Sequence, residues 1–192
     1  MIIGVDVDGV ILDYMNIVRA YAELYDFEIL HKNGVVNKKG IKVKERYDWS
    51  DEEAKVFADQ YFDHLTTITN FNPLAIDIIN RLHDEGNKIY IISNRGLLSE
   101  KAMSLCEELF AKNNLKIDKY FWKIKDKLKV IKEHNVDIMI DDSFSVCKQT
   151  SDNNIPTLYF REKDSEEINS KYIYDVDNWG QIYRVIQNLK SL

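Results

Sequence analysis

Residues 2–9 have the sequence IIGVDVDG, an apolar run that ends at two carboxylates and a glycine. Isoleucine and valine at this density are typical of a buried strand. Ionised carboxylates avoid burial unless they are paired or hold a metal, so acids at the end of this run indicate more than packing. Side chains alternate along a strand, so Asp6 and Asp8 point to the same side. The sequence therefore predicts a metal-assisted site at the edge of a sheet.

Two more apolar runs end in polar side chains, and a lysine-rich stretch at residues 123–132 lies between them. If all three strands are parallel, their polar ends meet at one edge, where ligands bind in open α/β sheets. The runs are residues 89–92, followed by Ser93 and Asn94, and residues 136–140, followed by Asp141 and Asp142.

Strand-like and helix-like patterns alternate along the rest of the chain. Ile17, Val18, Tyr21 and Leu24 have helical spacing directly after the first run, and Ser50 precedes three acids as an N-cap would. This alternation predicts an α/β fold, with a Rossmann-like parallel sheet and helices on both faces. The expected strands cover residues 2–6, 89–92, 120–123, 136–140 and 156–160, and the expected helices cover residues 14–28, 51–65, 73–85, 98–113, 127–134, 144–151 and 179–190.

The chain has 192 residues and a formal net charge of −6. This length suggests one domain with a modest insert. An acidic chain lacks the basic face that phosphate contacts require, which argues against a nucleic-acid polymer as partner. No apolar run approaches the roughly 18 residues of a membrane span, and no charged leader precedes the first strand, so we expect a cytoplasmic protein without a membrane partner. Cys106 and Cys147 lack the spacing of a zinc site or redox pair, and we expect both to be packing residues.

The polar residues, taken in order, resemble the four motifs of the haloacid dehalogenase (HAD) superfamily of phosphotransferases. All four motifs in the right order are a far more specific signal than any one of them. The match spans roughly residues 1–160. The matching positions are residues 6–10 (DVDGV) for the first motif, Ser93 for the second, Lys127 for the third, and Asp141 with Asp142 for the fourth.

Within that superfamily the chain resembles the 5'(3')-deoxyribonucleotidases and their prokaryotic nucleotidase-like relatives. It shares with them an insert after the first motif, the segment FNPLA at residues 71–75 and the segment DNWGQIY at residues 177–183. The resemblance implies a HAD-like core at residues 1–13 and 72–192, with a small helical cap at residues 14–71. The second motif reads SNR, whereas many members carry Thr, and this departure bears on substrate identity.

The resemblance also implies an activity: a Mg²⁺-dependent phosphomonoester hydrolase with an aspartyl-phosphate intermediate, acting on a nucleoside monophosphate. Asp6 would be the nucleophile, and Asp8 would protonate the leaving alkoxide and later activate water. The implied phosphate ligands are Ser93, Asn94 and Lys127, and the implied Mg²⁺ ligands are Asp6, Asp8 through its backbone carbonyl, Asp141 and Asp142.

Several alternatives stay open. Lys129 could replace Lys127, and Arg95 could contact substrate or form a surface salt bridge. Most aromatic residues of the insert are expected to fill a small core, with one or two facing the substrate. A sugar phosphate or another small phosphometabolite is the alternative substrate. A non-catalytic phosphate-sensing module is the alternative from another class, although the intact pair of Asp6 and Asp8 argues against it. The oligomeric state, a homodimer included, is open.

Overall fold

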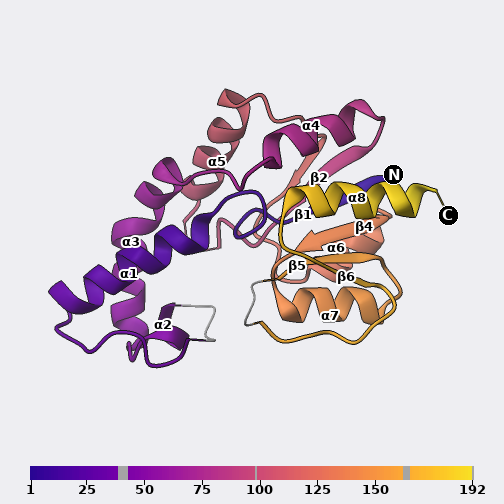
Figure 1. Ribbon diagram of the computed structural model, residues 1–192. Coiled ribbons are helices and arrows are strands. Elements are labelled where there is room, and N and C mark those ends of the chain that lie inside the picture. The colour runs from indigo at the N-terminus through magenta and orange to yellow at the C-terminus, as the bar shows by residue number, and fades with distance from the viewer. Residues whose placement is uncertain (39–42, 98, 162–164, 192) are drawn as a thin grey trace.

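Six parallel strands form one sheet in the order β3-β2-β1-β4-β5-β6 among the residues that the structure describes. The structure is a computed structural model, and it describes residues 1–38, 43–97, 99–161 and 165–191 (Figure 1). β1 pairs with β2 and β4, so the strand that leads into Asp6 is central. This confirms the expected Rossmann-like α/β fold. The strands are β1 (Ile2–Val5), β2 (Lys88–Ile92), β3 (Lys119–Phe121), β4 (Ile138–Asp141), β5 (Thr157–Phe160) and β6 (Ile173–Val176).

Helices cover both faces of this sheet, which is why its central strands are apolar on both sides (Figure 1). Ile3, Val5 and Ile138 are at most 1% exposed. Cys106 and Cys147, in two of the helices, are buried and free, which confirms their expected packing roles. Within the described ranges, no helix is long and apolar enough to cross a membrane. α4 (Ala75–Asp84) and α8 (Trp179–Lys190) lie on one face, and α6 (Lys127–Glu133) and α7 (Phe144–Asp152) lie on the other.

Three helices form a separate helical unit at the carboxyl edge of the sheet (Figure 1). In this unit α1 packs on α3, and α3 also packs on α5, which lies outside the unit. Its interior is aromatic: the ring centroids of Tyr25, Trp49 and Phe57 lie 5.2 to 5.4 Å apart, and all three side chains are buried. Most aromatic residues here thus fill a small core, as expected, while a role of residues 14–71 as a cap stays a prediction. The helices are α1 (Tyr14–Glu28), α2 (Val43–Arg46), α3 (Asp51–Ile68) and the neighbouring α5 (Lys101–Lys112).

α3 begins with a capping box at the expected N-cap. Ser50 Oγ accepts a hydrogen bond from Glu53 N at 3.2 Å, and Glu53 Oε2 accepts one from Ser50 N at 2.7 Å. Ser50→Ala should therefore lower the free energy of unfolding by about 1 kcal/mol, measured by urea titration. Ser104→Ala is the matched control inside α5 and should cost clearly less, because within the described residues its hydroxyl bonds only the Lys101 carbonyl. Equal losses would contradict the capping role.

The structure departs from the expected elements at several positions. β6 (Ile173–Val176) was not expected, because its mostly half-exposed residues at the sheet edge show no buried run. α4 begins at Ala75 and not at Pro73, because Leu74 has a left-handed backbone (φ 67°) that interrupts the helical path. α5 begins at Lys101, later than the expected start at Leu98, which itself lies outside the described residues. α2 is one turn in a segment where no helix was expected.

Candidate active site

The loop after β1 folds back on itself and carries Asp8. Asp6 N donates to Ile140 O of β4 at 2.9 Å, which extends the strand pairing to Asp6 at the carboxyl edge. Leu12 N then donates to Val7 O, also at 2.9 Å, and closes a tight turn around Asp8. Both acids are thereby fixed beside the ends of the central strands.

Two distant side chains hold this loop in position. Trp179, the first residue of α8 and fully buried, donates from Nε1 to Val10 O at 3.0 Å. Asn72 Nδ2 donates to the same oxygen at 2.8 Å and to Gly9 O at 3.1 Å. Gly9 has a φ of +83°, and an added Cβ would overlap the Asp142 carboxylate. Both the backbone and this close approach therefore require glycine at position 9.

Lys127 lies between two of the expected acids. Its Nζ is 2.8 Å from Asp6 Oδ1 and 2.7 Å from Asp141 Oδ2, and all three side chains are at most 7% exposed. Burial lowers the pKa of Lys127, but the charges of Asp141 and Asp6 outweigh burial and raise the pKa above its ordinary value. Lys129, the open alternative, is 68% exposed and lies 3.8 Å from Glu133. Lys127 is therefore the lysine that the fold brings to the acids.

Asp6, Asp141 and Asp142 form an acidic cluster, with one carboxylate oxygen of each within 4.8 Å of the others. Burial raises the pKa of Asp141 to about 6, opposed by the charge of Lys127 and reinforced by that of Asp6. Burial and the charges of Asp6 and Asp141 raise the pKa of Asp142 well above its ordinary value. Asp6 Oδ1 faces the Lys127 ammonium at 2.8 Å and has no other hydrogen-bond donor among the described residues. A bound cation would stabilise such crowded acids.

Asp8 has a different cationic partner, Arg95. Arg95 Nη2 donates a short hydrogen bond to Asp8 Oδ1. Arg95 Nη1 donates to Thr66 Oγ1 of α3 at 2.8 Å, and the guanidinium carbon lies 4.5 Å from the centroid of the Tyr14 ring in α1. Arg95 is 6% exposed, so of its two open alternatives the surface salt bridge is wrong. Burial raises the pKa of Asp8, and the charge of Arg95 opposes that increase.

Ser93 and Asn94 follow β2 at the same edge of the sheet. Ser93 is fully buried, and its Oγ accepts a hydrogen bond from Arg95 N at 3.2 Å. Asn94 is exposed. Within the described part of the chain, no hydrogen bond joins either residue to Asp6 or Asp8. Ser93 and Asn94 thus lie at the same edge of the sheet as the acids, without a hydrogen bond to them.

Sequence reasoning does not single out Thr66, Tyr14 or Asn72 as part of this centre. Tyr14 lies in an expected helix and Thr66 lies one residue beyond the end of another, and nothing in the apolar spacing distinguishes either residue. Asn72 stands directly before a proline, which is a turn signal and the one available clue that its side chain supports a loop.

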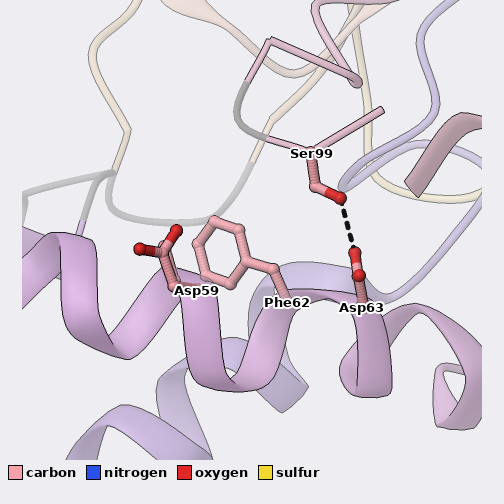
Figure 2. A pocket seen from close by; sticks show the side chains of 5 residues that line it. Asp59, Phe62, Asp63 and Ser99 are labelled. Carbon is pink, nitrogen blue, oxygen red and sulfur yellow. Dashed lines mark hydrogen bonds between the residues drawn. The ribbon is translucent and has the colours of Figure 1, made fainter. Parts of the chain in front are cut away.

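A hollow of about 150 Å³ opens between α3 and the loop after β2, and Figure 2 shows the side chains that line it. Asp59, Phe62 and Asp63 come from α3, and Ser99 Oγ donates to Asp63 Oδ1 at 2.7 Å across the hollow. Phe62 is thus an aromatic residue of the helical unit that faces open space. Another hollow, of about 320 Å³, reaches Asp142. Its lining residues are Gly9, Asp13, Met15, Asn16, Asn72, Asp142, Phe160, Arg161 and Asp177.

Solved structures that match nearly the whole chain give it the fold of the HAD-superfamily hydrolases. One is a HAD-superfamily hydrolase of subfamily IA from Geobacter sulfurreducens PCA, with 13% identity, a TM-score of 0.63, and coverage of 96% of this chain and 98% of that chain. A predicted phosphatase from Clostridium acetobutylicum has 15% identity, a TM-score of 0.68, and coverage of 97% and 98%. A mutant of CbbY from Rhodobacter sphaeroides, in complex with xylulose-(1,5)bisphosphate, has 12% identity, a TM-score of 0.63, and coverage of 94% and 95%. No protein-family model and no curated protein matches the chain.

Proposed function

We propose that this protein is a HAD-type phosphomonoester hydrolase that works through an aspartyl-phosphate intermediate. The observation that carries this proposal is the position of Lys127 between Asp6 and Asp141, at the end of the central strand. Phosphoryl transfer needs a nucleophile, a proton donor for the leaving oxygen, and positive charge against the phosphoryl oxygens. A carboxylate, a neighbouring second carboxylate and a buried lysine match these needs. The fold supports the same function by analogy.

In the proposed reaction Asp6 attacks phosphorus, which forms an acyl phosphate and breaks the bond to the leaving oxygen. Asp8 gives its proton to that oxygen, then takes a proton from the water that attacks the acyl phosphate. The second step frees inorganic phosphate and restores the Asp6 carboxylate. Lys127, together with Ser93 and Asn94, would bind the transferring group through charge and hydrogen bonds.

The acids fit a divalent cation. The three carboxylates of the acidic cluster meet one cationic side chain, Lys127, which leaves a formal excess of two negative charges. Apart from Lys127, Asp6 Oδ1 has no hydrogen-bond donor among the described residues. We assign Asp6, Asp141, Asp142 and the Asp8 carbonyl as ligands of Mg²⁺, which prefers such oxygen donors. When bound, Mg²⁺ would offset negative charge on the phosphoryl group.

Gly9→Ala tests the role proposed for Asp142, since the new methyl group would displace that carboxylate. Gly86→Ala is the matched control, because Gly86 has a φ of +85° and nothing within 4 Å of an added Cβ. Both variants should lose about 1–2 kcal/mol of stability through backbone strain. Only Gly9→Ala should also bind Mg²⁺ about tenfold more weakly in calorimetric titration. The same Mg²⁺ affinity in both variants would argue against a metal role for Asp142.

For the substrate we propose a nucleoside monophosphate, which would make the protein a 5'(3')-(deoxy)ribonucleotidase. Phe62 supports this, because a ring that lines a hollow can stack on a base, with the helical unit acting as the cap. A small sugar phosphate is the second candidate. It is favoured by the hollow of about 150 Å³, which is below the roughly 300 Å³ of typical ligand pockets. CbbY, a structural neighbour, binds a sugar bisphosphate.

Phosphate release from a panel of compounds tests the proposal, with Mg²⁺ in one arm and EDTA in the other. The panel contains 5′- and 3′-(deoxy)ribonucleotides, sugar phosphates and p-nitrophenyl phosphate. We expect Mg²⁺-dependent release that favours deoxyribonucleotides. Preference for sugar phosphates would keep the chemistry and change the substrate. No release from any compound, by protein shown to be folded, would contradict the hydrolase and favour a phosphate-sensing module.

A further inference from the structure

The buried guanidinium of Arg95 has no part in the reaction as proposed above. We propose that Arg95 is a positioning residue that fixes the Asp8 carboxylate and fastens it to the helical unit. This inference rests on the proposed function, because the proposed reaction requires Asp8 to transfer a proton. It adds a residue to the site and a physical link between the cap helices and the chemistry.

The exposures of the two side chains separate their roles. The Arg95 side chain is 3% exposed, whereas that of Asp8 is 23% exposed. A substrate can therefore reach Asp8 but not the guanidinium behind it. Arg95 bonds Asp8 Oδ1, and Asp8 Oδ2 accepts no hydrogen bond from the described residues. One oxygen is thus held and the other is available for proton transfer.

Arg95 is in turn anchored by both long helices of the helical unit. Thr66 of α3 accepts from Nη1 at 2.8 Å, and the guanidinium carbon lies 4.5 Å from the centroid of the Tyr14 ring of α1. The Nε atom of Arg95 is buried without a hydrogen-bond partner among the described residues. The N–H groups of an arginine form a rigid fork with a fixed mutual geometry. Contacts that hold one side of the guanidinium therefore also fix the N–H group that bonds Asp8. The orientation of Asp8 therefore depends on the position of α1 and α3.

A series of leaving groups distinguishes this role from substrate binding. p-Nitrophenyl, phenyl and benzyl phosphate have similar shapes, but their leaving groups become steadily more basic and need more help from a general acid. Arg95→Lys keeps the charge and loses the fork. It should lower kcat/KM about 100-fold for benzyl phosphate and leave p-nitrophenyl phosphate within about threefold of wild type. A thermal melt of each variant checks that the fold is kept.

Thr66→Val is a milder variant with a close control. It removes the hydroxyl that Arg95 Nη1 contacts and should lower benzyl phosphate hydrolysis about fivefold. Thr69→Val replaces another buried threonine, whose hydroxyl has no hydrogen-bond partner among the described residues, and should leave every rate unchanged. If Thr66 acts through Arg95, Thr66→Val should add nothing further in the Arg95→Lys background.

Four results would overturn the inference. An equal loss on all three compounds, or a loss confined to KM, would make Arg95 a structural or binding residue in an active hydrolase. Additive effects of the Thr66 and Arg95 variants would remove the link to the helical unit. Wild-type protein inactive on all three compounds and on the metabolite panel would overturn the proposed function, and this role of Arg95 with it.

Discussion

Asp6→Asn is expected to lower kcat by about 10⁴-fold or more while the protein stays folded. The amide cannot form an acyl phosphate with the substrate, and it removes one of the charges assigned to Mg²⁺. Asn has nearly the same shape as Asp, so the packing around the end of β1 should persist. Phosphate release from p-nitrophenyl phosphate, together with a thermal melt, measures both parts of the prediction.

The intermediate provides a second readout for the same variant. Wild-type protein quenched in acid during turnover should carry bound phosphate that hydroxylamine releases, here called the label. Asp6→Asn should carry none. Asp8→Asn should be slow in turnover and still carry the label, because the nucleophile remains. Asp77→Asn is the matched control: Asp77 is exposed in the first turn of α4, and this change should leave turnover and label intact. Label on Asp6→Asn would show that another residue is the nucleophile.

Lys127→Met should be the most destabilising change at this site. It leaves Asp6 and Asp141 buried side by side without their shared cation. Breaking a buried ion pair by removing one partner costs about 3–5 kcal/mol, and urea titration in EDTA would measure the loss. Phosphate release should fall about 10²–10³-fold, because the charge proposed to stabilise the transferring group is gone.

The stability loss in Lys127→Met should grow with pH. With Lys127 present, the pKa of Asp141 is about 6, already above its ordinary value of 3.8. A carboxyl with a raised folded pKa destabilises the fold as pH rises from the unfolded value through the folded one. Without the lysine this window extends further upward, so the variant should be closer to wild type at low pH than at neutral pH. Lys129→Met, on the exposed side of the same helix, should change neither stability nor rate. A variant of Lys129 as damaged as that of Lys127 would refute the assignment.

The sequence predicts the acids because each ends an apolar run, whereas Lys127 is singled out by the resemblance to the HAD motifs. Asp6 and Asp141 end apolar runs, and Lys127 begins a helix capped by Asp126. Parallel strands share a carboxyl edge, so the order of these runs is sufficient to bring their ends together. The central strands and most helix positions follow from periodicity in the same way.

The environment of Asp8 could not be predicted from such patterns. Its hydrogen bond to Arg95 joins positions 87 residues apart, and an arginine in that loop could equally have pointed to solvent. Thr66 and Tyr14 belong to this environment only because α1 and α3 pack over the loop that carries Arg95. β6 was missed for a related reason: an edge strand with half-exposed residues gains its order from the neighbour it pairs with, not from its own apolar run.

The hydrogen bond from Trp179 to Val10 has a consequence for how the chain acquires activity during synthesis. The two residues are 169 positions apart, and the loop that carries Asp8 leaves the ribosome long before the indole that supports it. A nascent chain halted before α8 would already contain Asp6, Lys127 and Asp141, yet its β1 loop would lack this support. Competence for the reaction should therefore arise only after α8 has been synthesised and has docked.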